Sequence, residues 1–303
     1  SPHDGNDVDT LLMNADTAMY HAKDGGKNVY RFYNQSLNAA ARERLSLENS
    51  LRQAVARGEM FLCFQPQVDL RNGAIAGLEA LARWRNDDHG LVSPGHFVPI
   101  AESCGLIIEL GQWVLKTACR TARSWQDAGQ AISVAVNVSG VQFRQPDIVD
   151  VVAATLSETG LDPRLLELEF TETVIMEGGR DNVEKLLRLQ EMGVRLAIDD
   201  FGTGYSSLRY LKEFPVNALK IDQSFIKDLG VSDTDGAIAQ GIIALAHGLG
   251  VEVVAEGVES ERQLRHLRLL DCDKVQGFLL GHPLHADDAR RVVENPDTRL
   301  VQL

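Results

Sequence analysis

The chain has 303 residues, with 43 Asp and Glu against 30 Lys and Arg, and therefore a formal net charge of −13. A hydrophobic content of 44% and a charged content of 24% are typical of a globular protein, and they exclude a wholly disordered chain. The acidic balance argues against binding to DNA along its backbone. No apolar run reaches the roughly 18 residues of a membrane span.

Residues 1–9 are polar and acidic, unlike a signal peptide. The four cysteines are scattered, which is typical of buried thiols in a reducing compartment. The dispersed histidines argue against a zinc site. We therefore expect a cytoplasmic protein with no direct membrane contact from this chain. Whether a longer protein is membrane-anchored through other segments stays open.

Residues 1–35 are predicted to form a small piece of their own. A helix is indicated by apolar residues that share one face, namely Leu11, Ala15, Ala18 and Ala22. Residues 28–33 then predict a short, aromatic-rich strand. One helix and one strand cannot bury a core, so this piece resembles the end of a domain whose remainder lies elsewhere. A second helix follows and ends near Gly58.

From residue 58 onward, strand and helix patterns alternate. Strands are predicted at 60–68, 74–84, 131–138, 165–170, 194–200, 217–222, 251–256 and 274–279. Helices are predicted at 94–128 in two pieces, 147–159, 181–192, 204–213, 236–249, 259–270 and 285–294. This α/β pattern fits a modified TIM (β/α)₈ barrel better than an open sheet. Residues 69–73 are too few for a crossover helix, so the first strand should be antiparallel to the second.

Polar residues interrupt the apolar strands at or near their C-terminal ends. They are Glu79, Asn137, Glu169, Asp199, Lys220, Glu256 and Gln276. In a barrel those ends meet at one mouth, where active sites are built. Counting Asp200, five carboxylates would converge there, which is prohibitively unfavourable without cations. The oxygen donors favour Mg²⁺ or Mn²⁺ over zinc and suffice for two ions per active site.

The adjacent Asp199 and Asp200 would point apart on a continuing strand, so we expect the strand to end there, with residues 201–204 as the turn. Taken singly, each polar residue could have a structural role instead of a role in an active site. An acidic residue at a strand end is more often a helix cap or a surface ion pair. Lys220 alone could be a salt-bridge partner or a Schiff-base lysine of a barrel lyase. The joint occurrence at seven strand ends favours an active site.

These residues resemble the EAL family of bacterial cyclic di-GMP phosphodiesterases. The tripeptide Glu79-Ala80-Leu81 gives the family its name. Further matches are FQPQVDL (64–70), NVS (137–139), ELEFTE (167–172), DDFGTGYSSL (199–208), LKID (219–222), AEGVE (255–259) and CDKVQGF (272–278). The resemblance covers approximately residues 45–295. It implies a metal-dependent hydrolase that opens cyclic di-GMP to linear 5′-pGpG by in-line attack of water.

The resemblance also implies a role for each residue. The first metal would be held by Glu79, Asn137, Glu169 and Asp199, and the second by Asp199 and Asp200 with Glu256 nearby. Lys220 would contact or deprotonate the attacking water, and Glu256 and Gln276 would hold water at the metals. The dinucleotide would be contacted by Gln65, Leu81 and Arg83. No metal or catalytic position is substituted, which favours an active enzyme over a catalytically weak cyclic di-GMP receptor, the alternative that we retain.

Two expectations concern larger assemblies. The resemblance implies that Glu172 and Glu259 fix the loop 200–208, which in this family also touches the partner in a homodimer. The segment ADTAMYHAKDGGKNVYRFY (15–33) is similar to the end of a GGDEF diguanylate cyclase domain, without its signature loop. We therefore divide the chain into a GGDEF remnant with a linker (1–35) and an EAL phosphodiesterase domain (36–303).

Overall fold

The structure is a computed structural model that describes residues 7–12, 14–15, 19, 35–177, 179–203, 213–231 and 233–294. The chain divides into two compact units, one made of residues 1–59 and 85–106 and the other of residues 60–84 and 107–303. The predicted strand at 28–33 lies outside the described residues. The proposed boundary between residues 35 and 36 stays a prediction.

The first unit contains α2 (Gln35–Ala54), β3 (Gly90–Val92) and α3 (Pro94–Ser103). Its helices pack against each other, and both contribute apolar side chains that are buried, namely Leu47, Leu51, Phe97 and Ile100. Arg44 of α2 also donates a hydrogen bond to the Ser103 hydroxyl at 3.0 Å. The prediction that residues 94–128 form two helices is confirmed, since α3 is followed by a separate helix, α4 (Ile107–Asp127).

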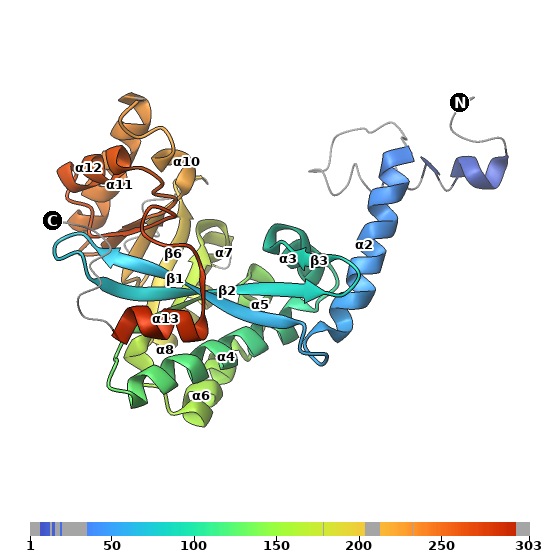
Figure 1. Cartoon of the computed structure of the whole chain (residues 1–303), viewed down its shortest axis with the longest axis horizontal. Helices are drawn as coiled ribbons and strands as arrows, with labels where there is room; N and C mark the ends of the chain where they lie inside the picture. Colours follow the sequence, from blue (N-terminus) through green and yellow to red (C-terminus); the bar gives the residue numbers. More distant parts are fainter. Residues whose placement is uncertain are drawn as a thin grey trace. The chain divides into compact units, whose positions relative to one another are not determined.

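The second unit is a closed barrel of eight strands (Figure 1). The strands are β1 (Met60–Asp69), β2 (Ile75–Asn86), β4 (Ser133–Asn137), β5 (Leu166–Thr171), β6 (Arg195–Phe201), β7 (Ala218–Ile221), β8 (Glu252–Ala255) and β9 (Lys274–Gln276). The strands after β1 follow one another in parallel. β1 closes the ring by antiparallel pairing with both β2 and β9. The predicted modified TIM barrel with an antiparallel first strand is therefore confirmed.

Helices cover the outside of the barrel, and α4, α6 and α8 lie together on one side of it (Figure 1). Besides α4 they are α5 (Gly140–Phe143), α6 (Ile148–Thr159), α7 (Glu172–Glu177), α8 (Gly179–Glu191), α10 (Gln223–Ile226), α11 (Asp233–Gly248), α12 (Glu261–Leu269) and α13 (Ala286–Glu294). A short 3₁₀ turn (Pro163–Leu165) precedes β5, and β10 (Leu284–His285) pairs with β1. The predicted helix at 204–213 falls almost entirely outside the described residues.

Strand alternation decides which side chains form the core. Every second residue of a strand points outward, and these apolar side chains are fully buried under the helices, as with Leu78, Leu168 and Leu219. Phe64 meets the indole of Trp125 in α4 edge-on at 5.0 Å. The remaining strand residues point into the barrel, so their polar groups can gather at its mouth.

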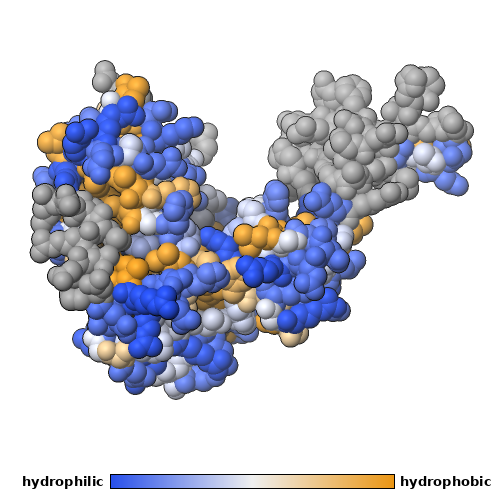
Figure 2. Space-filling model, viewed as in Figure 1, coloured by the Kyte–Doolittle hydropathy of each residue, from blue (hydrophilic) through white to orange (hydrophobic). Residues whose placement is uncertain are grey.

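On the face shown in Figure 2, hydrophilic residues predominate and hydrophobic residues form separate patches. Within the described residues, no helix is both long enough and apolar enough to cross a membrane.

Candidate active site

Polar side chains converge at one end of the barrel because the parallel strands all reach that end with their C-termini. Asn137 and Gln276 are the last residues of β4 and β9, and Glu256 directly follows β8. β1 runs the opposite way, and its register with β2 pairs Gln65 with Glu79. The reversed strand thereby brings an amide to the same level as the carboxylates.

The structure resolves how Asp199 and Asp200 share this mouth, and the strand ends one residue later than expected. β6 continues to Phe201, and its pairing with β7 shifts between Ile198 and Phe201. Asp200 has a φ of 54°, in the left-handed region, and its backbone N–H donates to Asp199 Oδ1 at 2.9 Å. An extra residue of this kind redirects the side chain that follows it. Both carboxylates can therefore face the same hollow.

Lys220 lies at the centre of the carboxylates and is 1% exposed. Its Nζ is 2.7 Å from both Glu169 Oε2 and Glu256 Oε1. Asp199 Oδ1 and Glu79 Oε2 are 3.4 Å and 3.6 Å away. One ammonium leaves three of these four negative charges unbalanced if all the carboxylates are ionised. Such an excess in a buried site demands either protons or further cations.

Two amides complete the cluster around Glu79. Asn137 Nδ2 donates to Glu79 Oε1 at 2.6 Å, and Gln276 Nε2 donates to Glu79 Oε2 at 2.5 Å. Gln276 also donates to Gln65 Oε1 at 3.2 Å, and Gln65 Nε2 donates to the Gly281 carbonyl at 3.1 Å. The amide nitrogens are thus turned toward Glu79, and the amide oxygens of Asn137 and Gln276 remain available as ligands.

The pKa values follow from burial and these charges. Burial of Lys220 lowers its pKa, but the charges of Glu169, Glu79 and the other carboxylates outweigh burial and hold the pKa well above its usual value. Burial, together with the charges of Glu79 and Asp199, holds the pKa of Glu169 well above its usual range despite Lys220. Burial likewise raises the pKa of Glu256 to about 8. The cluster therefore retains protons when carboxylates and Lys220 are its only charged members.

The pKa of Glu79 is lowered, whereas the pKa values of Glu169 and Glu256 are raised. Burial alone raises its pKa, but the charge of Lys220 and the hydrogen bonds from Gln276 and Asn137 lower it overall. Burial, and then the charges of Asp199 and Asp222, raise the pKa of Asp200. The expected role of Lys220 in deprotonating water consequently requires that its carboxylate neighbours be neutralised first.

The cluster opens into a hollow of about 280 Å³. Its walls include the predicted residues Gln65, Glu79, Asp199, Asp200, Glu256, Glu259 and Gln276. One carboxylate oxygen from each of Asp199, Asp200 and Glu256 lies within 4.8 Å of the other two. A hollow of this size, open to solvent and lined by polar groups, can admit part of a nucleotide ligand.

These residues fit oxygen-coordinated divalent cations. The donors are carboxylate and amide oxygens, the ligands that Mg²⁺ and Mn²⁺ prefer. Glu169 Oε1 and Gln276 Oε1 are buried acceptors without a hydrogen-bond partner, and buried polar atoms of that kind call for a ligand. The surplus of negative charge around Lys220 favours the same conclusion.

Comparison with known proteins identifies the family. The EAL domain model matches residues 48–283. The chain belongs to the EAL domain family. Two relatives in Pseudomonas aeruginosa are the bifunctional diguanylate cyclase/cyclic di-GMP phosphodiesterase MucR and the cyclic di-GMP phosphodiesterase NbdA. MucR is 48% identical over 287 residues, which are 94% of this chain and 42% of MucR. NbdA is 44% identical over 284 residues, 93% of this chain and 36% of NbdA.

The chain thus spans about four-tenths of the length of these curated relatives. A solved structure described as the MucR phosphodiesterase in complex with c-di-GMP matches the fold with a TM-score of 0.79. The two are 46% identical, and the match covers 80% of this chain and 99% of that chain. The barrel described above is therefore that of an EAL domain.

Within this EAL domain, four predicted residues stand apart from the Lys220 cluster. Leu81 and Arg83 continue the face of β2 that carries Glu79, beyond the hollow, and Arg83 Nη1 donates to the Ala82 carbonyl at 2.9 Å. Glu172 is buried and accepts a hydrogen bond from the Gly202 N–H at 3.1 Å. Glu259 lines the hollow. The remainder of the 200–208 loop, from residue 204, lies outside the described residues.

Five further residues line the hollow that were not predicted as site residues, namely Asp222, Gln223, Gly257, Gly277 and Phe278. Asp222 lies two residues after Lys220, and Phe278 lies two residues after Gln276. The alternation that identified their neighbours could have indicated both. Phe278 is 54% exposed and its ring stacks on His282 with centroids 4.4 Å apart. The mouth therefore combines carboxylates with an exposed aromatic face.

Proposed function

We propose that this EAL domain is a metal-dependent phosphodiesterase that hydrolyses cyclic di-GMP to linear 5′-pGpG. The observation that carries the proposal is the intact set of oxygen donors around Lys220, with no metal or catalytic position substituted. The names of MucR and NbdA and the c-di-GMP complex of MucR support the same substrate.

The donor set divides into two cation sites. We define the first cation site as Glu79, Asn137, Glu169 and Asp199, and the second as Asp199, Asp200 and Glu256. Bound Mg²⁺ or Mn²⁺ would lower the pKa of water and stabilise the charge that develops on the phosphate. Asp199 would contribute to both sites.

The remaining residues orient the reactants. Gln276 and Glu256, which both line the hollow, would hold the attacking water through an amide oxygen and a carboxylate. Lys220 is an ammonium while its carboxylate neighbours keep their charge, so it can accept a proton only after they are neutralised. Gln65, Leu81 and Arg83 would contact the dinucleotide, Arg83 through a phosphate.

The experiment is to incubate the protein with cyclic di-GMP and Mn²⁺ or Mg²⁺ and to separate the nucleotides by chromatography. We expect 5′-pGpG to accumulate, and we expect the product to be lost with EDTA and in Glu79→Ala. Glu184→Ala, which removes an exposed carboxylate of α8 remote from the mouth, is the matched control and should keep full activity.

The second candidate function is a receptor that binds cyclic di-GMP without hydrolysing it. Unchanged substrate, together with heat of binding in calorimetry, would establish that function and overturn the hydrolase. A homodimer is part of the proposal and predicts a dimer mass by light scattering. The GGDEF remnant and the cytoplasmic location stay predictions.

A further inference from the structure

The position of the Asn137 side chain affects the geometry of the first cation site. Asn137 ends β4, and its Nδ2 donates to Glu79 at 2.6 Å, which leaves its Oδ1 as the one amide oxygen of the first cation site. Its side chain is exposed rather than packed in the core. Besides the hydrogen bond to Glu79, the backbone that follows β4 therefore contributes to the position of Asn137.

Two contacts fix that backbone. The Val138 N–H donates to the Glu169 carbonyl at 2.9 Å. The next residue, Ser139, caps α5 reciprocally with Gln142. Ser139 Oγ accepts from the Gln142 N–H, and Gln142 Oε1 accepts from the Ser139 N–H, both at 3.2 Å. A capping box of this kind satisfies two backbone donors and sets the angle at which the chain enters the helix.

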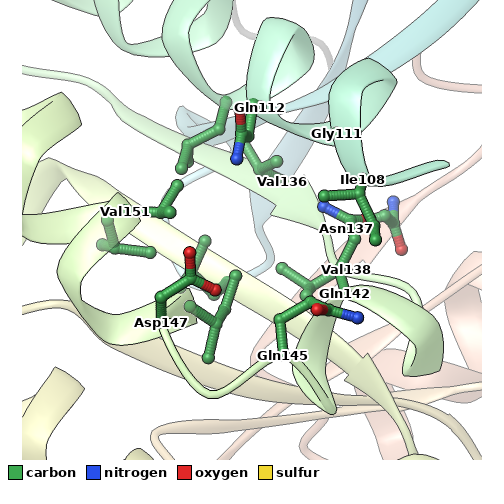
Figure 3. A pocket seen from close by; sticks show the side chains of 14 residues that line it. Ile108, Gly111, Gln112, Val136, Asn137, Val138, Gln142, Gln145, Asp147 and Val151 are labelled. Atoms are coloured by element: carbon green, nitrogen blue, oxygen red, sulfur yellow. The ribbon is translucent and has the colours of Figure 1, made fainter. Parts of the chain in front are cut away.

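Gln142 is itself held by α4. The side chain is 8% exposed, and its carboxamide lies where a Cβ on Gly111 would be. Figure 3 shows Gly111, Asn137 and Gln142 together at one side of a pocket between β4 and the helices α4, α5 and α6. That pocket has a volume of about 20 Å³, room for roughly one or two water molecules. The contact between Gln142 and Gly111 is therefore a close packing contact between α5 and α4, and the pocket beside it is too small for a nucleotide ligand.

We propose that Gln142, seated on Gly111, is a positioning residue for Asn137 and thereby sets the cation affinity of the first cation site. This inference rests on the proposed function, because it takes Asn137 as a ligand. Gln142 acts through the Ser139 N–H, two residues from Asn137, and α4 prevents its carboxamide from turning away. Groups that orient a metal ligand without touching the metal commonly tune affinity by about 10-fold or more.

The test measures Mn²⁺ binding by electron paramagnetic resonance, without nucleotide, at a temperature where circular dichroism shows each variant folded. Gln142→Met removes the acceptor for the Ser139 N–H, and we expect about 10-fold weaker Mn²⁺ binding. Gln142→Glu keeps an acceptor, since glutamate serves equally in a capping box, and should restore affinity. A purely structural role would lower the melting temperature and leave the Mn²⁺ affinity unchanged.

Gly111→Ala is the second, independent variant, since its methyl group would displace the Gln142 carboxamide. We expect it to weaken Mn²⁺ binding as Gln142→Met does. Gly241→Ala in α11 is its matched control, because a Cβ there meets nothing within 4 Å, and its Mn²⁺ affinity should equal that of the unaltered protein.

Asn137→Ala separates this inference from the proposed function. If it leaves Mn²⁺ binding unchanged, Asn137 is not a ligand and the assignment of the first cation site fails. If Asn137→Ala weakens binding but Gln142→Met and Gly111→Ala bind as the unaltered protein does, the positioning role is overturned and the site assignment stands.

Discussion

At the scale of single residues, Lys220 is the group on which the mouth depends. Its ammonium lies within 3.6 Å of four carboxylates and offsets one of their negative charges. An internal cation of this kind stabilises a site that would otherwise repel itself, and it also competes with added cations for the same oxygens.

Replacing Lys220 by methionine should therefore destabilise the protein in the presence of EDTA. Removing one partner of a buried ion pair costs on the order of 3–5 kcal/mol, because the remaining charges lose their compensation. Added Mn²⁺ should recover most of that free energy of unfolding. Urea unfolding with and without Mn²⁺ measures both effects, and Lys227→Met, on an exposed side chain, serves as the control.

Glu256 should make the metal-free protein less stable as the pH rises. Its pKa is raised from 4.5 to about 8, mainly by burial. The folded state therefore binds the proton more tightly than the unfolded chain does. This contribution is fully present below the unfolded value of 4.5 and is lost as the pH rises through about 8. Urea unfolding in EDTA across this range should show a shallower decline for Glu256→Gln. An equal slope in both proteins would contradict the prediction.

The sequence predicted which residues meet at the mouth better than it predicted their backbone conformations and pKa values. Alternation along the strands was enough to bring Glu79, Glu169 and Lys220 together. The φ of 54° at Asp200 depends on the irregular pairing of β6 with β7, which no local pattern specifies. The raised pKa of Lys220 depends on four carboxylates from four strands, so it emerges only once the barrel closes.

At the scale of elements, the turn after β8 and the end of β9 form one close contact. Gly277 directly follows β9, and a Cβ there would overlap the backbone of Val258. The Val258 N–H donates to the Gln276 carbonyl at 3.0 Å, which ties the two segments together. This contact brings Glu256 and Gln276, which flank it, toward the same hollow.

Gly277→Ala should accordingly be more damaging than an ordinary glycine substitution. Overpacking against rigid backbone typically costs about 1–3 kcal/mol, and here it should also move Gln276 away from Glu79. We expect lower stability in urea and weaker Mn²⁺ binding together. Gly236→Ala in α11, where a Cβ meets nothing within 4 Å, should change neither. If Gly277→Ala is as stable as the unaltered protein, the backbone at Val258 can move to accommodate the methyl group and the prediction is wrong.

The same contact explains a boundary that the sequence did not predict. The strand was expected at 274–279 because apolar residues continue there, yet β9 ends at Gln276. Gly277 leaves the strand to pack on Val258, a residue 19 positions earlier in the chain. The other predicted strands that fall within the described residues agree with the structure within two residues at each end, since their alternation is long enough to fix the period.

At the scale of the whole molecule, the net charge of −13 works against an anionic ligand. A cyclic dinucleotide carries two phosphate charges, so long-range repulsion should slow its approach, while the proposed contacts with Arg83 and with cations would act only at short range. At constant MgCl₂, raising KCl to about 0.1 M screens charges beyond roughly 10 Å. We therefore expect KM to fall as KCl increases from low concentration. A steady rise in KM would show that the local cationic contacts dominate.

The reversed first strand has a consequence for how the chain is made. β1 can pair early with β2, its neighbour in sequence, but its other partners, β9 and β10, lie about 200 residues later. During synthesis the hairpin must therefore wait with one edge unpaired until the last strands leave the ribosome. An open edge of this kind can pair with a wrong chain. The yield of folded protein should thus depend on translation speed over the final strands more than on their stability.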